Sequence, residues 1–419
     1  MSKVGMRRET LDARETLGAP RASRLTPRRV SGLTSRAPWP KVKLGEVCAS
    51  ISDGDHLPPP KCESGIPFVT ISDIKNNKFD LSNTRFVPKT YFDTIDEKRR
   101  IRKGDVLYSV VGSYGIPVYA DTDLEIAFKR HIAILKPSDT VDSRFLYYSM
   151  LCPAFYNAAD NVAIGAAQKT ITLSALRNLE IPLPPLSVQR RVADILSAYD
   201  DLIENNRRRI AILEETARLA FQTSIVEGAW ESKPVTALID VNPEVPKPKC
   251  GNVRYVPMSA LSTTGMTVDL TDSEMRAEST SVRFVNGDVL LARITPCLEN
   301  GKTAYVNFLE DGEIGCGSSE FIVLRGKRVS SYFTYCLSRL EAFRGIAIKS
   351  MVGASGRQRV QLSCFSDISI QFPDKATLKE FDTTVEPMFK QISVLSKQNA
   401  SLATSRDMLL PRLIKGSNN

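Results

Sequence analysis

The chain has 419 residues, of which 42% are hydrophobic and 25% charged, and 56 lysines and arginines against 47 aspartates and glutamates give a formal charge of +9. This is the composition of a soluble globular protein with two or three domains. No apolar run approaches the roughly 18 to 20 residues of a membrane span, and the first forty residues lack the apolar core of a signal peptide, so neither an integral membrane protein nor a Sec-exported one is expected. Eight scattered cysteines and two histidines argue against a zinc site and histidine-based nucleophilic catalysis, and fit a reduced cytoplasm.

The first 38 residues carry nine lysines and arginines against three acidic residues, with few large apolar residues. Such a segment cannot bury enough apolar surface to fold, so residues 1–38 are predicted to be a disordered basic leader. The leader would help to hold a phosphate backbone. A translation start assigned upstream of the true one is the alternative explanation.

From Trp39 onward the chain repeats itself once, which is the most informative feature of the sequence. Three pairs of segments match at offsets of 187, 183 and 188 residues: Phe68–Ser72 with Tyr255–Ser259, Ile101–Leu107 with Phe284–Leu290, and Gly165–Ala166 with Gly353–Ala354. The small drift in offset indicates minor loop changes on one scaffold.

Each copy opens with alternating apolar and polar runs that predict short strands, at 105–111 and 131–135 and again at 288–294 and 320–324. One helix is predicted to follow in each copy, over Asp142–Ala159 and Ser330–Ile348. A glycine-bearing loop and a last short strand then follow, and prolines end each copy, within Ile181–Pro185 in the first and at Pro373 in the second.

Two heptad seams follow the proline stops and predict a pair of long helices. Setting the helices antiparallel, with paired residue numbers summing to 605, places Asn206 opposite Asn399 in a polar layer. The apolar layers would then be Leu196 with Leu409, Ile203 with Leu402, Ile210 with Leu395, Leu213 with Ile392, Ala217 with Met388 and Ala220 with Val385. A one-sided core helix is the alternative, and Pro387 predicts a kink or a fresh start in the second helix. The residues predicted to pair are Leu196, Tyr199, Ile203, Asn206, Ile210, Leu213, Ile392, Leu395, Asn399, Leu402 and Leu409.

The predicted fold class is therefore α+β, with two globular domains of mixed sheet and helix joined by an antiparallel coiled-coil pair in a pseudo-twofold repeat. The predicted segments are the leader 1–38, a first globular domain 40–185, a first spacer helix 186–230, a second globular domain 231–373 and a second spacer helix 374–415.

Enzyme motifs fit the sequence poorly. Gly301-Lys302-Thr303 resembles the end of a phosphate-binding loop, but Pro296 stands where the loop needs a glycine. Asp80 with Asp96-Glu97-Lys98 is the nearest fit to a metal-dependent nuclease, although such a charged run is usually a solvated face. The adenine-binding Asn/Asp-Pro-Pro-aromatic motif of a DNA methylase is missing from the sequence. These patterns favour binding over chemistry.

Loops at matched positions of the two copies carry the side chains that nucleic-acid recognition uses. Arginine and lysine suit guanine or phosphate, glutamine suits adenine, and small neighbours allow close approach. Ordinary exposed polar loops are the alternative for each residue. The DNA-binding candidates are Lys61, Ser113, Tyr114, Lys129, Arg130, Gln168, Lys169, Thr170, Arg293, Lys302, Arg357, Gln358 and Arg359.

Together these features resemble the specificity subunit of a type I restriction-modification system. The particular marks are Lys43–Val47, Lys103–Leu107, Gly165–Lys169 and, above all, Ile181–Val192, a Pro-Pro-x-x-x-Gln helix start. The second copy departs from this pattern, since Phe372-Pro373-Asp374 replaces the double proline and no glutamine follows at the matching spacing.

The resemblance implies a non-catalytic reader of double-stranded DNA, in which each target-recognition domain reads one half of a bipartite, asymmetric site and the helices set the unread gap. Two adenine methyltransferase subunits and, through them, restriction/translocase subunits would be the partners. The chain would need no cofactor of its own, since S-adenosylmethionine, Mg and ATP would belong to these partners. A nuclease or NTPase acting on DNA and a protein-only scaffold are the rival functions.

Overall fold

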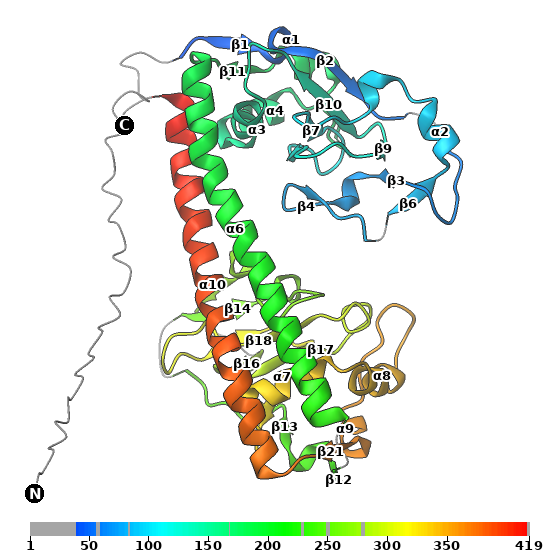
Figure 1. Ribbon diagram of the computed structural model, residues 1–419, viewed down its shortest axis with the longest axis vertical. Coiled ribbons are helices and arrows are strands. Elements are labelled where there is room, and N and C mark those ends of the chain that lie inside the picture. Colours follow the sequence, from blue (N-terminus) through cyan, green and yellow to red (C-terminus); the bar gives the residue numbers. More distant parts are fainter. Residues whose placement is uncertain are drawn as a thin grey trace, which may run out of the picture. The chain divides into compact units, whose positions relative to one another are not determined.

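The computed structural model describes residues 39–55, 59–82, 84–166, 168–227, 230–248, 252–277 and 281–416, so the leader predicted at 1–38 lies outside the described residues. Tertiary contacts divide the chain into unit 1, residues 1–192 and 411–419, and unit 2, residues 193–410. Both units combine helices with sheets, which confirms the α+β class (Figure 1). The five-segment division of the sequence stays a prediction. None of the helices within these ranges combines the length and the apolar character that a membrane crossing requires.

Unit 1 is built around a four-stranded antiparallel sheet in the order β2-β10-β7-β8. Its strands are β2 (Cys48–Asp53), β7 (Val106–Ser109), β8 (Pro117–Tyr119) and β10 (Ile132–Pro137). All of β7 and the first four residues of β10 are buried, so these central strands are apolar on both faces. A second sheet has the order β6-β3-β9, with β3 (Ile66–Val69), β6 (Arg85–Val87) and β9 (Ala127–Phe128).

The remaining elements of unit 1 are short. β1 (Lys41–Lys43) pairs with β11 (Glu180–Pro182), and β4 (Ile74–Lys75) pairs with β5 (Lys78–Phe79). The helices are α1 (Leu44–Val47), α2 (Lys89–Asp93), α3 (Ser143–Leu151), α4 (Pro153–Val162) and α5 (Leu173–Asn178), with the 3-10 turns η1 (Ile71–Asp73) and η2 (Glu97–Arg99).

Unit 2 repeats this topology. Its central sheet, in the order β13-β20-β17-β18, consists of β13 (Ile239–Val241), β17 (Val289–Ala292), β18 (Thr303–Tyr305) and β20 (Phe321–Gly326). The second sheet, β15-β14-β19-β16, consists of β14 (Val253–Val256), β15 (Glu274–Arg276), β16 (Val282–Phe284) and β19 (Gly315–Gly317). β12 (Glu231–Pro234) pairs with β21 (Ser369–Phe372). The internal repeat is thus confirmed at the level of topology, with β16 as an added strand that the described part of unit 1 lacks.

The sequence predicts a single helix after the strands of each copy. The structure has two helices there in both units, so that prediction is wrong. In unit 1, α3 stops at Cys152, whose backbone is extended (ψ 133°) because Pro153 follows it. In unit 2, α7 (Ser331–Arg339) and α8 (Glu341–Lys349) are separated by Leu340 in the same conformation (ψ 134°) without a proline. The short α9 (Cys364–Asp367) follows.

The two long helices are α6 (Leu186–Phe221) and α10 (Lys375–Lys415), of 36 and 41 residues. A π-helical turn, η3 (Gln222–Val226), continues α6. The fresh start predicted at Pro387 does not occur, because α10 passes through this exposed residue without a break. Val385 and Phe389 on either side of it are buried in the core of unit 2, so packing outweighs the hydrogen bond that proline removes.

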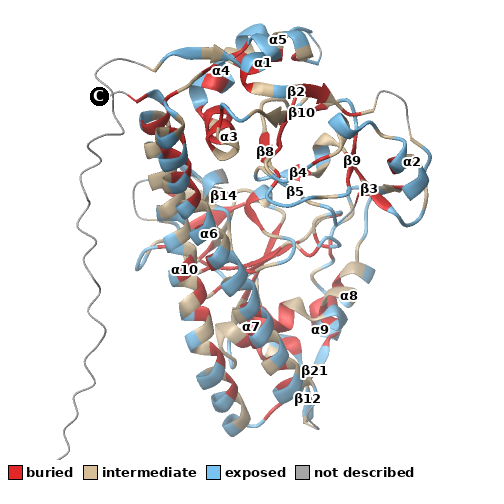
Figure 2. Cartoon of the chain, turned by 45° about the horizontal axis from the view of Figure 1, so that its top comes forward, coloured by how far each residue is buried: buried red, intermediate tan, exposed pale blue. Residues whose placement is uncertain are grey.

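The predicted antiparallel register is confirmed at its polar layer. Asn206 Nδ2 donates to Asn399 Oδ1 at 3.0 Å, and about two turns away Arg406 Nη1 donates to Asp200 Oδ1 at 2.5 Å. As the residue number rises on one helix it falls on the other, so the helices run antiparallel. The other predicted layers stay predictions, and their residues are all buried or half-buried, as the red and tan faces of both helices in Figure 2 indicate.

The glutamine of the Pro-Pro-x-x-x-Gln helix start has a structural role. Gln189 is 1% exposed; its Oε1 accepts from the backbone N–H of Asp142 at 2.8 Å, and its Nε2 donates to the carbonyl of Pro184 at 2.8 Å. Asp142 is the N-cap of α3. This side chain therefore ties the beginning of α6 to the beginning of α3.

Candidate nucleic-acid interface

In unit 1 three segments meet at one edge of the central sheet. Because β10 is antiparallel to both neighbours, β2 and β7 end where β10 begins, with Asp53 opposite Ala133 and Ser109 opposite Ile132. The segments beyond these ends are joined by backbone hydrogen bonds from Arg130 to the carbonyl of Asp55 at 3.0 Å and from Val110 to the carbonyl of His131 at 2.9 Å.

The glycine-bearing loop 164–170 joins the same edge. Thr170 pairs with both Ile164 and Val111, and the N–H of Gly112 donates to the carbonyl of Lys169 at 3.2 Å. Gly165 has φ +111°, and a Cβ there would lie 2.5 Å from the carbonyl oxygen of Gln168, so the loop can close only around a glycine. We call residues 53–55, 110–115, 129–131, 164–166 and 168–170 the unit 1 edge.

Seven of the eight DNA-binding candidates of unit 1 lie on this edge, and most of them are exposed. Lys61 is exposed on the loop before β3, outside the unit 1 edge. The candidates brought together are Ser113, Tyr114, Lys129, Arg130, Gln168, Lys169 and Thr170.

The unit 1 edge carries one organised cluster of polar side chains. Lys169 Nζ lies 2.7 Å from Asp160 Oδ1, and the hydroxyl of Tyr114 donates to the same oxygen. The ring of Tyr114 stacks on that of Tyr156, with centroids 6.1 Å apart and planes 2° from parallel. The hydrogen bond from Lys169 lowers the pKa of Asp160, so this carboxylate stays ionised at neutral pH.

A second carboxylate fixes the turn at residue 55. Asp55 accepts a hydrogen bond from the hydroxyl of Tyr91, and its Oδ1 lies 3.4 Å from Nη1 of Arg99. Burial and the neighbouring carboxylate raise the pKa of Tyr91, so its hydroxyl stays protonated. Asp55 therefore braces the turn that hydrogen-bonds to Arg130.

Unit 2 forms the equivalent edge with its own segments. Arg293, directly after β17, donates its N–H to the carbonyl of Glu320, directly before β20, at 2.8 Å. Arg359 pairs with both Ile294 and Val352, as Thr170 pairs with Val111 and Ile164. We call residues 293–295, 318–320 and 352–359 the unit 2 edge.

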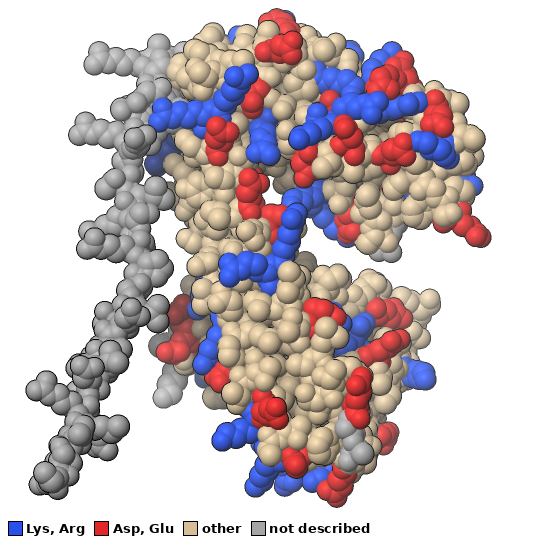
Figure 3. All heavy atoms as spheres, viewed as in Figure 1, with Lys and Arg blue, Asp and Glu red and all other residues tan. Residues whose placement is uncertain are grey.

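The side chains of the unit 2 edge are arranged differently. Arg359 Nη2 donates to Glu320 Oε1 at 2.6 Å and its Nε to both carboxylate oxygens at 2.9 and 3.0 Å. Arg357 is exposed, Gln358 is half-buried with its backbone bonded to Thr295, and Arg293 is half-buried. On the face drawn in Figure 3, lysines and arginines are interspersed with acidic residues in both units, so local clusters rather than a uniformly basic face characterise this surface.

Lys302 lies outside the unit 2 edge. Its ammonium donates to the carbonyl of Met258 at 2.7 Å and the residue is half-buried, so its part in DNA binding stays a prediction. The same contact leaves it unsuited to the phosphate-loop role considered for Gly301-Lys302-Thr303.

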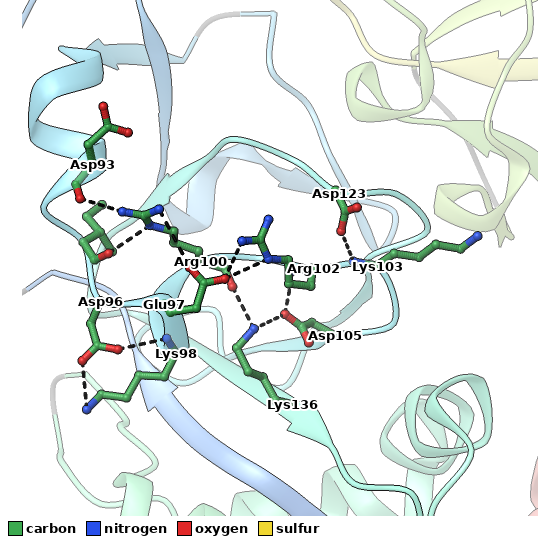
Figure 4. Close-up of polar contacts among 11 residues, drawn as sticks. Asp93, Asp96, Glu97, Lys98, Arg100, Arg102, Lys103, Asp105, Asp123 and Lys136 are labelled. Atoms are coloured by element: carbon green, nitrogen blue, oxygen red, sulfur yellow. Dashed lines mark hydrogen bonds and ion pairs between the residues drawn. The ribbon is translucent and has the colours of Figure 1, made fainter.

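The carboxylates considered for a nuclease have structural partners (Figure 4). Asp96 Oδ1 accepts from the backbone of Lys98 at 3.0 Å and so caps η2, while Glu97 accepts from Arg102 Nε at 2.9 Å. Asp80 pairs with Lys75. Within the part of the chain that the structure describes, no group of three or more histidines, cysteines and carboxylates is placed to hold a metal ion.

Sequence reasoning missed the acidic partners of both edges. Glu320 is the counterpart of His131 at an offset of 189 residues, so aligning the two copies places it on the edge. Asp160 lies on α4, and the sequence around it carries no signal that directs it to Lys169.

Comparison with known proteins agrees with this architecture. Residues 37–215 match the family model of the type I restriction modification DNA specificity domain. The MjaIX specificity subunit of Methanocaldococcus jannaschii is 24% identical over 67% of this chain and 70% of its own length, and the StySPI specificity subunit of Salmonella potsdam is 20% identical over 80% and 77%. The alignment to the M. jannaschii MjaVIII specificity subunit, at 27% identity, covers only 44% of that protein.

The fold has a solved counterpart. The crystal structure of a type I restriction-modification S subunit from M. genitalium is similar with a TM-score of 0.54, at 16% identity over 92% of this chain and 98% of that one. The family model, the curated relatives and the fold agree with the repeated topology and the helix start at Gln189, and the chain is similar to the type I restriction-modification specificity subunits.

Proposed function

We propose that the chain is a non-catalytic, cytoplasmic DNA reader in which the unit 1 edge reads one half of a bipartite, asymmetric site and the unit 2 edge reads the other. The observation that carries the proposal is the matched pair of edges. In each, a glycine-bearing loop is hydrogen-bonded beside the end of β7 or β17 and carries a glutamine with a lysine in unit 1 or with arginines in unit 2. These side chains suit base edges and phosphates.

The long helices set the unread gap between the two half-sites in this proposal. α6 is continuous over 36 residues, and the Asn206–Asn399 pair fixes the register of the helix pair. Inserting one heptad beside Asn206 and one beside Asn399 adds roughly 10.5 Å to the helices, and the gap should widen by about three base pairs.

The partners in this proposal are two adenine methyltransferase subunits and, through them, the restriction subunits. S-adenosylmethionine, Mg and ATP belong to these partners, and the chain itself needs no cofactor. The exposed outer faces of the helices, with Leu202, Ile212 and Leu219 on α6, offer apolar surface for docking.

The direct test is DNA selection by the full-length chain co-expressed with its methyltransferase subunits. A randomised duplex pool should yield two specified blocks separated by an unread gap. Failure to select any duplex would favour the protein-only scaffold. Turnover of DNA or nucleotide by the purified chain, lost in Asp96→Ala or Lys302→Ala, would favour the enzyme.

A further inference from the structure

Both edges hold a cationic side chain against a carboxylate. We propose that Glu320 and Asp160 are positioning residues, which fix Arg359 and Lys169 for base reading and at the same time weaken binding to DNA of any sequence. This inference rests on the proposed function of the two edges.

In unit 2 the carboxylate engages only one side of the guanidinium. Glu320 accepts from Nε and Nη2 of Arg359, so the Nη1 side is the one that can face a ligand. Arg359 is held on two sides, because its backbone pairs with Val352 and Ile294 while its side chain pairs with Glu320. A guanidinium held in this way loses less rotamer freedom when it forms a bidentate pair with a base.

In unit 1 the same arrangement is built from other elements. The carboxylate of Asp160 comes from α4, whereas Glu320 precedes β20. Lys169 matches Gln358 in the repeat, so the two held cations stand at neighbouring rather than identical positions. Tyr114 donates to the same carboxylate oxygen and stacks on Tyr156, which restricts where the carboxylate can lie. The two units thus form the same kind of cation–carboxylate pair from different elements.

Stability is a poor explanation for these pairs. The side chains of Arg359 and Glu320 are 46% and 23% exposed, and those of Lys169 and Asp160 are 49% and 39% exposed. Ion pairs this open to solvent contribute little to folding. The pKa values of both carboxylates are lowered by their cationic partners, so both carry a full negative charge at neutral pH.

An ionised carboxylate on a DNA-binding edge acts in two ways. It repels phosphate, which lowers the affinity for every sequence, and it prevents the cation from swinging to the nearest phosphate. A cation that contacts phosphate reads no sequence, whereas one held over a base edge does. Removing the carboxylate should therefore strengthen non-specific binding and weaken discrimination, which is opposite to the effect of a lost structural contact.

The test compares Glu320→Gln and Asp160→Asn in the full-length chain with its methyltransferase subunits. The probes are the duplex selected by the wild-type complex and a scrambled duplex of equal length. Glu274→Gln and Asp139→Asn are matched controls: the first removes the same charge beside Arg276, and the second removes it from the exposed turn after β10, at the opposite end of that strand.

For Glu320→Gln we expect tighter binding to the scrambled duplex and a selected-to-scrambled affinity ratio that falls about 5- to 150-fold, the range of one bidentate base contact. Asp160→Asn should change both quantities in the same directions by less, because the lysine ammonium is a point charge on a flexible stem and lacks the rigid donor fork of arginine. The controls should leave the ratio unchanged.

Two results separate the possible failures. If the wild-type complex selects a sequence but the ratio is unchanged in both variants, or both affinities fall together with the melting temperature, the positioning role is wrong while the proposed function stands. If the wild-type complex selects no sequence, the proposed function fails and this inference fails with it.

Discussion

The turn before β10 carries the exposed cations Lys129 and Arg130, whereas the matched turn before β20 carries Ser318 and Ser319. The backbone hydrogen bonding of the two edges is nevertheless the same. In unit 1 the N–H of Val110 donates to the carbonyl of His131, and in unit 2 the N–H of Arg293 donates to the carbonyl of Glu320. The comparison teaches that main-chain pairing and buried strands specify the edge, while the exposed side chains on it can diverge.

The largest expected effect concerns the buried ion pair beside each central sheet. Asp288 is fully buried and bonded to Arg325 through Nε and Nη2 at 2.6 and 2.7 Å, whereas Asp105 has a single contact with Lys136 at 2.7 Å. Asp288→Ala should destabilise unit 2 by about 3 to 5 kcal/mol, because it leaves a cation without its partner in a partly buried site. Asp105→Ala should cost unit 1 about 1 to 3 kcal/mol. Urea unfolding, monitored by hydrogen exchange in β17 and β7, measures both losses of stability. Equal losses in the two units would contradict this difference between them.

The next effect concerns which half-site each edge reads. Lys169→Ala should relax recognition in one half-site and Arg357→Ala in the other, each by about 1 to 3 kcal/mol if the contact is bidentate to a base. Binding to duplexes with single base changes measures the loss. An equal loss on every sequence would make these residues phosphate contacts.

The charge difference between the edges predicts a difference in salt dependence. Replacing Lys129 and Arg130 by alanine should reduce the slope of log affinity against log salt by about 2, at roughly 0.9 per phosphate contact. The matched control, Ser318→Ala with Ser319→Ala, should leave the slope unchanged. An unchanged slope in the first variant would show that these cations do not contact phosphate.

The smallest effect is a pH dependence confined to unit 2. Burial raises the pKa of Glu214, which accepts from the Tyr335 hydroxyl and from the N–H of Met266 at 2.9 Å. Between the ordinary pKa of 4.5 and the raised one the folded state binds more protons than the unfolded state, so stability falls as pH rises through this window. Glu214→Gln should melt higher than wild type at neutral pH, with the difference vanishing near pH 4. A variant that melts lower at every pH would contradict this account.

Much of the fold follows from the sequence, because its signals are local. Heptad spacing predicts α6 and α10, and matching segments at a nearly constant offset predict the repeat. The polar layer predicts the contact of Asn206 with Asn399. The break at Leu340 and the continuous helix through Pro387 do not follow, because tertiary packing decides both.

The candidate site is predictable in position but not in pairing. Lys169 and Arg359 lie in loops that the repeat identifies. Their carboxylate partners come from other segments, nine residues before Lys169 on α4 and 39 residues before Arg359. Only the folded chain brings them together. Lys302 gives a second example. Its spacing resembles that of a phosphate-binding loop, but in the fold its ammonium donates a hydrogen bond to the carbonyl of Met258.

The central claim is that each edge reads one half of a bipartite site, and mapping methylated adenines in cells that express the complex tests it most directly. Wild type should yield two specified blocks with an unread gap, and Lys169→Ala and Arg357→Ala should each degrade a different block. A single continuous motif, or both variants degrading the same block, would contradict the claim.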